Sequence, residues 1–117
     1  MKVILVEDNA DLVESMRVLL QLHGHEAKCY LSASELLEDL GGIGEQDLVV
    51  SDYYLPDLNG VELLKRVRAE RPGVKAILLT GSREDGIVKA AQAIPGCGVL
   101  FKPLEYESLA RSMRAML

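Results

Sequence analysis

Four short apolar runs, each followed by a polar side chain, constrain the fold of this chain more than any other feature. Runs of three or four residues are too short for helices, but they suit strands that are buried on both faces. Helical patterns separate the runs, and this alternation predicts parallel strands joined by helices. The runs and the polar residues that follow them are 3–6 with Glu7 and Asp8, 48–51 with Asp52, 76–79 with Thr80, and 99–101 with Lys102.

The polar residues that follow these runs should meet in space. Parallel strands bring their carboxyl ends to one edge of a sheet, and open α/β sheets bind ligands at that edge. Three carboxylates in one pocket repel one another, so they need protons or a cation, and such oxygen ligands suit Mg²⁺ or Mn²⁺. The Lys102 ammonium and the Thr80 hydroxyl can hold phosphoryl oxygens. Together these groups predict a site for phosphoryl transfer.

The remaining elements are predicted from hydrophobic periodicity and from signals at the ends of helices. Ser32 followed by Glu35 predicts a capping box at the start of a helix. Gly86 weakens the first turn of the predicted fourth helix by about 1 kcal/mol relative to alanine. The predicted elements are a helix that includes residues 12–20 and ends near 23, a strand near 26–30, and helices over 32–40, 60–71, 83–93 and 105–117.

The composition predicts a single domain over residues 1–117 with an aliphatic core, because 49% of the residues are hydrophobic and Trp is absent. An apolar run of 18 residues and a signal-peptide pattern are both missing, so we expect a cytoplasmic protein outside the membrane. The net charge of −5 argues against nonspecific binding to nucleic acid. Cys29 and Cys97 lack the spacing of metal ligands and are expected to be reduced and half-buried.

The order of the polar features resembles the receiver domain of bacterial two-component response regulators, over essentially the whole chain. The matching features are the acidic pair Glu7-Asp8, then Asp52, Thr80 and the dipeptide Lys102-Pro103, together with the loop of residues 52–60, Asp-Tyr-Tyr-Leu-Pro-Asp-Leu-Asn-Gly. The resemblance implies a flavodoxin-like, doubly wound (βα)5 fold. Its five-stranded parallel sheet would have the order 2-1-3-4-5, with helices on both faces.

The resemblance also implies how the acidic residues act. Asp52 would be the nucleophile that accepts a phosphoryl group, forming an acyl phosphate while Lys102 and the metal shield the incoming charge. Asp8, Asp52 and the backbone carbonyl of Tyr54 would bind Mg²⁺ or Mn²⁺ directly, and Glu7 would act through water. Such a domain is a signalling protein and not an enzyme, since it catalyses at most its own phosphotransfer and dephosphorylation.

The resemblance further implies a switch at the ends of the last two strands. The backbone N–H groups of Gly81 and Tyr54 would approach the phosphoryl group, and Thr80 would turn toward it and pull its loop inward. A cis peptide bond between Lys102 and Pro103, common in the family, would direct the lysine into the pocket. Tyr54, with Ser82, stands where a bulky side chain can keep water out and slow the hydrolysis of the acyl phosphate.

Several of these residues have simpler explanations. Asp8 or Asn9 could do no more than cap the first helix, and Asp57 is typical of a turn after proline. Thr80 could be an ordinary β-branched strand residue, and Lys102 a solvated surface charge. The position of each polar residue at the end of a predicted strand favours the functional interpretation.

One position departs from the family pattern. Receiver domains usually carry Tyr or Phe three residues before the lysine, and here that position is Val99. Phe101 or the loop after Thr80 would then have to carry the signal to partners. The family's usual output surface is formed by the fourth helix, the fifth strand and the fifth helix. On this surface the chain places Lys89, Gln92, Glu105, Arg111 and Arg114.

The expected partners are a sensor histidine kinase or a histidine phosphotransfer protein, and an output domain or a second copy of the chain. The domain could belong to a longer regulator or hybrid kinase, and we expect it to make no direct contact with nucleic acid. Two alternatives to the phosphorylation switch remain at this point. One is a phosphorylation-independent pseudo-receiver, and the other is a flavodoxin-like cofactor protein or a small metal-dependent phosphatase.

Overall fold

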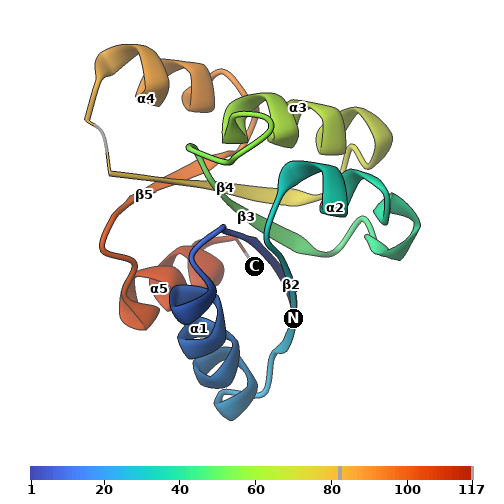
Figure 1. The fold of residues 1–117 in the computed structure, drawn as a ribbon, viewed down its shortest axis with the longest axis vertical. Helices are drawn as coiled ribbons and strands as arrows, with labels where there is room; N and C mark the ends of the chain where they lie inside the picture. Colours follow the sequence, from blue (N-terminus) through green and yellow to red (C-terminus); the bar gives the residue numbers. More distant parts are fainter. Residues whose placement is uncertain (82, 117) are drawn as a thin grey trace.

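The computed structural model describes residues 1–81 and 83–116. Within them, five parallel strands form one sheet in the order β2-β1-β3-β4-β5 (Figure 1), as predicted. The strands are β1 (Lys2–Val6), β2 (Glu26–Tyr30), β3 (Leu48–Asp52), β4 (Lys75–Thr80) and β5 (Gly98–Phe101). The helices are α1 (Ala10–Leu22), α2 (Ala33–Leu37), α3 (Gly60–Glu70), α4 (Asp85–Gln92) and α5 (Tyr106–Ala115), with a short 3₁₀ helix at Leu40–Gly42.

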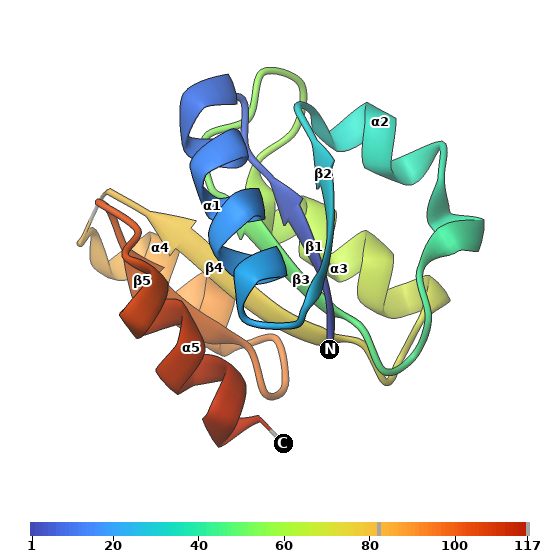
Figure 2. The ribbon, with the colours of Figure 1, turned by 90° about the horizontal axis from the view of Figure 1, so that it is seen from below.

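The helices cover both faces of the sheet, so the fold has three layers. Figures 1 and 2 show α1 and α5 on one face and α2, α3 and α4 on the other. Each face carries its own aliphatic core, because successive side chains of a strand point to opposite sides. Ile4, Val49 and Leu78 belong to the core beneath α2, α3 and α4. Leu5 and Val50 belong to the core beneath α1 and α5.

The three central strands are almost fully buried, which explains why they read as continuous apolar runs in the sequence. Strand β5 lies at an edge of the sheet, and all four of its residues remain partly exposed. The register pairs Val6 with Ser51, Asp52 with Leu79, and Thr80 with Phe101. The carboxyl ends of β1, β3, β4 and β5 therefore lie along one edge, as the sequence predicts.

The prediction for the second helix was wrong at its end. Helix α2 ends at Leu37 instead of continuing to Leu40, and the 3₁₀ turn follows it. The Asp39 carboxylate explains the early end, because it accepts a hydrogen bond from the Tyr30 hydroxyl at 2.5 Å and pairs with Lys28 at 2.8 Å. These contacts draw the chain toward β2 before a further helical turn can form.

The predicted capping box at the start of α2 forms, but one of its two hydrogen bonds has a different donor. Ser32 Oγ accepts a hydrogen bond from the Glu35 backbone N–H, as predicted. The Glu35 carboxylate, however, accepts from the N–H of Leu31 instead of the N–H of Ser32. At the start of α1, the side chain of Asn9 supplies the cap, accepting from the N–H groups of Asp11 and Leu12. The simpler explanation thus holds for Asn9 and leaves Asp8 for the site.

The other predicted helices are confirmed with ends that differ by a few residues. Helix α4 begins at Asp85 and α5 ends at Ala115. The predictions that involve Ser82 and Leu117 lie outside the described residues. Cys29 and Cys97 are free thiols and half-buried, as expected. Across residues 1–81 and 83–116, every helix is too short or too polar to cross a membrane.

Candidate functional site

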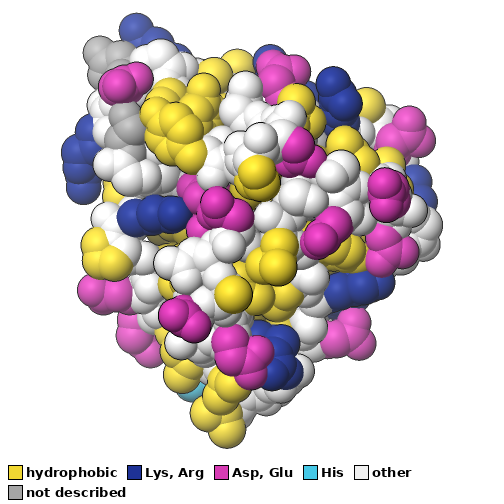
Figure 3. All heavy atoms as spheres, viewed as in Figure 1, with side chains coloured by type: hydrophobic (Ala, Val, Ile, Leu, Met, Phe, Trp, Pro, Cys, Tyr) yellow, Lys and Arg dark blue, Asp and Glu magenta, His cyan; other side chains and the backbone are white. Residues whose placement is uncertain are grey.

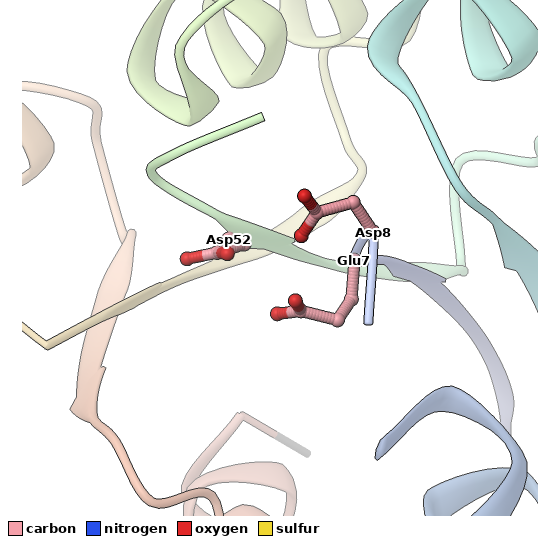
Figure 4. A group of neighbouring side chains, drawn as sticks. All are labelled: Glu7, Asp8 and Asp52. Carbon is pink, nitrogen blue, oxygen red and sulfur yellow. The ribbon is translucent and has the colours of Figure 1, made fainter. Parts of the chain in front are cut away.

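Three carboxylates gather at the carboxyl edge of the sheet. Glu7 and Asp8 follow β1 and Asp52 ends β3, and one oxygen of each lies within 4.8 Å of the others. Figure 4 shows the three side chains pointing into a common space between the two strand ends. Glu7 is 1% exposed and Asp52 is 3% exposed, whereas Asp8 is exposed to solvent. The predicted acidic cluster is therefore present, with two of its members buried.

Lys102 reaches this cluster from the end of β5. Its ammonium donates a hydrogen bond to Asp52 Oδ2 at 2.9 Å and lies 3.2 Å from Glu7 Oε2. Burial by itself would lower the pKa of Lys102, but the hydrogen bonds and charges of Asp52 and Glu7 outweigh it and raise that pKa. The peptide bond to Pro103 is cis, as predicted. Lys102 is thus a charged partner of the acidic cluster and not a free surface cation.

Glu7 holds its proton more tightly than an ordinary glutamate. Burial raises its pKa to about 7, and the neighbouring charge of Asp52 adds to this effect. The backbone N–H of Asn9, which donates to Glu7 Oε1 at 3.1 Å, and the Lys102 ammonium act in the opposite direction. Glu7 Oε2 is buried and lies 3.2 Å from the Lys102 ammonium, but this contact lacks the angles of a well-aligned hydrogen bond.

The donor set fits a divalent cation such as Mg²⁺. All the candidate side-chain ligands are carboxylate oxygens, which Mg²⁺ prefers, and Asp8 keeps the cluster open to water. The buried Oε2 of Glu7 also lacks a hydrogen-bond donor that a water molecule of a hydrated cation could supply. Excess negative charge, an unsatisfied oxygen and solvent access are together what a partly hydrated Mg²⁺ ion requires.

The residues of the predicted switch lie at the same edge. Thr80 is fully buried at the end of β4, and its backbone carbonyl accepts a hydrogen bond from the Lys102 N–H at 3.0 Å. Gly81 is exposed beside Lys102, since a Cβ at Gly81 would lie 4.0 Å from the Lys102 Cβ. Tyr54 is 60% exposed, and its ring meets Tyr53 edge-on with centroids 4.8 Å apart.

The loop between β3 and α3 is closed by a glycine that no other residue can replace without movement. A Cβ at Gly60 would lie 2.2 Å from the backbone oxygen of Asp52 and 2.9 Å from Leu78 Cδ1. The Gly60 N–H also donates to the Tyr53 carbonyl at 2.8 Å. This close approach places the start of α3 directly against the strand end that carries Asp52.

Three contacts at this edge were not predicted from the sequence. Glu7 forms an ion pair with Lys102. The sequence held one sign of this pair, because a glutamate side chain is one methylene longer than an aspartate side chain and reaches further. Asp57 is more than a turn residue, because its carboxylate binds the first turn of α2. The Arg83 guanidinium lies 4.0 Å from the ring centroid of Phe101, a cation–π contact between the loop after β4 and β5.

Comparison with known proteins decides the family. Residues 3–114 match the model of the response regulator receiver domain. The chain belongs to this family. As a receiver domain it serves phosphorylation-dependent signalling in two-component systems, and it is a signalling domain and not a classical enzyme. Magnesium binding and phosphorylation are typical of the family, and the acidic cluster of this receiver domain could hold such a metal.

Relatives and solved structures agree with this assignment. The receiver domain is 39% identical to the sensor kinase CckA of Brucella abortus, in an alignment that covers 98% of this chain and 12% of CckA. The chemotaxis response regulator CheY4 of Vibrio cholerae shares the flavodoxin-like fold with a TM-score of 0.86 at 24% identity, covering 99% of this chain and 98% of that one. The BeF₃-activated DrrB receiver domain has a TM-score of 0.81 at 29% identity, covering 98% and 96%.

The surface that usually carries output in this family is exposed in the receiver domain. Each of the five polar residues named for this surface is exposed. Val99 packs against the core beneath α2, α3 and α4, and Phe101 is only partly buried. Acidic side chains are spread over the face seen in Figure 3, in keeping with the net charge of −5.

Proposed function

We propose that this receiver domain is a switch in which Asp52 accepts a phosphoryl group from a sensor histidine kinase or a histidine phosphotransfer protein. The observation that carries this proposal is the 2.9 Å contact between Lys102 Nζ and Asp52 Oδ2, beside two further carboxylates. Structural carboxylates are seldom crowded in this way, since the repulsion destabilises the fold. The similarity to a BeF₃-activated receiver domain is consistent with a pocket that holds a phosphoryl-like anion.

The metal would be held by Asp8, Asp52 and the backbone carbonyl of Tyr54, with Glu7 acting through water. When bound, Mg²⁺ supplies positive charge that neutralises phosphoryl oxygens and lowers the repulsion between the donor and the acidic cluster. Mn²⁺ has the same ligand preference and is an equivalent choice.

Asp52 acts as the nucleophile. One carboxylate oxygen attacks the phosphorus in line, the bond from phosphorus to the donor histidine nitrogen breaks, and the nitrogen keeps the electron pair. Lys102 stabilises the negative charge that accumulates as the acyl phosphate forms. The Lys102 contact to Asp52 must then be exchanged for one to the phosphoryl oxygens, and Glu7 keeps the ammonium in place during this exchange.

The new charge at Asp52 is then converted into a change of shape. The Thr80 hydroxyl and the backbone N–H groups of Gly81 and Tyr54 are suited to donate to phosphoryl oxygens. The movement of Thr80 would pass along the hydrogen bond between its carbonyl and the Lys102 N–H to β5. Since Val99 replaces the usual aromatic residue, Phe101 or the loop after β4 carries the signal to the surface of α4, β5 and α5.

The partners follow from this switch. The domain over residues 1–117 would be one part of a longer regulator or hybrid kinase, since the chain spans about an eighth of CckA. Its output surface would bind an output domain, a separate partner, or a second copy of the chain after phosphorylation. The site of action would be the cytoplasm, where such kinases present their phosphohistidine, with no direct contact to nucleic acid or membrane.

The test is intact mass spectrometry after incubation with acetyl phosphate, with Mg²⁺ or with EDTA, on the wild type and on Asp52→Asn. A Mg²⁺-dependent gain of about 80 Da that is absent from the variant is expected, since one phosphoryl group is added. Glu38→Gln is the control, because it neutralises an exposed carboxylate at the end of α2 that is not part of the acidic cluster. Phosphorylation of Asp52→Asn, or its absence in the wild type with both acetyl phosphate and a phosphorylated donor protein, would count against the proposal.

A further inference from the structure

The side chain of Asp57 connects the loop that follows the phosphoacceptor strand to a helix more than twenty residues earlier. Asp57 Oδ1 accepts a hydrogen bond from the N–H of Ala33 at 3.1 Å, and Oδ2 accepts one from the N–H of Ser34 at 2.8 Å. Both donors lie in the first turn of α2. Two backbone donors thus bind one carboxylate, which fixes its position in two directions.

The two hydrogen bonds are favourable for the carboxylate and for the helix. The first N–H groups of a helix have no partner within the helix, and its positive dipole favours a carboxylate there. Ser32 satisfies only the N–H of Glu35, so Asp57 completes the cap of α2 from another part of the chain. Hydrogen bonds from the Ser34 side chain and from the two N–H groups lower the pKa of Asp57, so the carboxylate is ionised at neutral pH.

Among residues 1–81 and 83–116, the other hydrogen bonds of the loop of residues 53–59 lie mainly at its two ends. The Tyr53 N–H donates a hydrogen bond to the Leu79 carbonyl at 2.8 Å. The Asn59 side chain caps α3 by accepting a hydrogen bond from the Glu62 N–H at 2.9 Å. Leu55 and Leu58 pack against the core, but apolar contacts fix the orientation of a peptide group less sharply than hydrogen bonds do. The middle of this loop contains Tyr54, whose carbonyl is the proposed backbone ligand of the metal.

We propose that Asp57 is a positioning residue: by binding the loop of residues 53–59 to α2, it holds the Tyr54 carbonyl where a divalent cation beside Asp52 can use it. This inference rests on the proposed function, because it concerns the same metal site. Asp57 does not touch the metal or the phosphoryl group. Partners that orient metal ligands in this indirect way typically change metal affinity by about 10-fold or more when they are removed.

The test compares Mg²⁺ binding by the wild type, Asp57→Ala, Asp57→Asn and Ser32→Ala, measured by isothermal titration calorimetry on the whole chain. Asp57→Ala is expected to weaken Mg²⁺ binding about 10-fold. Asp57→Asn, whose amide offers a single acceptor oxygen, should have an intermediate effect. Ser32→Ala removes a cap of the same helix without breaking the link to the loop, so it should lower stability but leave Mg²⁺ affinity unchanged.

Two further measurements separate positioning from a loss of stability. The backbone amide signals of Ala33 and Ser34 should shift in the NMR spectra of the Asp57 variants, which reports the broken bonds directly. The rate of phosphorylation by acetyl phosphate should fall at low Mg²⁺ and recover at saturating Mg²⁺, because the defect lies in metal binding.

Failure of the inference about Asp57 can be distinguished from failure of the proposed function. If the wild type binds Mg²⁺ but accepts no phosphoryl group, the function is wrong while the comparison of affinities still tests Asp57. Unchanged Mg²⁺ affinity in Asp57→Ala would overturn the inference, and so would an equal loss in Ser32→Ala, since that loss would come from α2 alone. A wild type that binds no Mg²⁺ would overturn both.

Discussion

The buried carboxylate of Glu7 makes the metal-free domain less stable at neutral pH than it would be with a neutral side chain. Burial and the charge of Asp52 raise the pKa of Glu7 from 4.5 to about 7. The folded state therefore holds the proton more tightly than the unfolded chain does. The contribution of Glu7 to stability falls as the pH rises from about 4.5 to about 7, and it changes little above that range.

The size of this effect follows from the shift. A change in pKa from 4.5 to about 7 corresponds to about 3 kcal/mol. Glu7→Gln keeps the shape of the side chain without the charge. The metal-free variant should therefore be more stable than the wild type by about 3 kcal/mol at pH 8, and by only about 1 kcal/mol or less at pH 5.

The assay is urea unfolding in EDTA between pH 5 and pH 8, followed by circular dichroism. Glu38→Gln is the matched control, because it makes the same chemical change at an exposed glutamate at the end of α2, outside the acidic cluster. Added Mg²⁺ should stabilise the wild type more than Glu7→Gln under the proposed function. The reasoning is refuted if Glu7→Gln gains no stability at pH 8, or if it gains the same amount at pH 5.

Three further predictions concern the loop after β3 and helix α4. Gly60→Ala should destabilise the domain by about 3 kcal/mol or more, because its Cβ would overlap the backbone oxygen of Asp52. Gly86→Ala, at an open position in a helix, should instead stabilise the domain by about 0.5–1 kcal/mol. Urea unfolding measures both variants, and effects of the same sign would contradict this reasoning. Tyr54→Ala should speed the hydrolysis of the phosphorylated domain several-fold if the exposed ring, two residues after Asp52, hinders the approach of water as proposed. An unchanged decay of the phosphorylated mass would rule out that role.

Most of the sheet could be predicted because its signals are local. The central strands are buried on both faces, so their apolar runs are continuous and end where the chain returns to the surface. The end of α2 could not be predicted, because it depends on contacts from Asp39 to Tyr30 and Lys28 on a different element. Helix propensity near residues 38–40 gave no sign of that competition.

The sequence by itself determined which chemical groups stand at the strand ends, since the order of short apolar runs and polar residues is enough to bring Glu7, Asp52 and Lys102 to one edge. Only the tertiary structure decided how those groups meet. The ion pair between Glu7 and Lys102 joins residues 95 positions apart, and the bonds from Asp57 to α2 cross 23 and 24 positions. Contacts of this kind depend on the packing of whole elements, which places side chains within ångströms of partners that no local pattern of residues can specify.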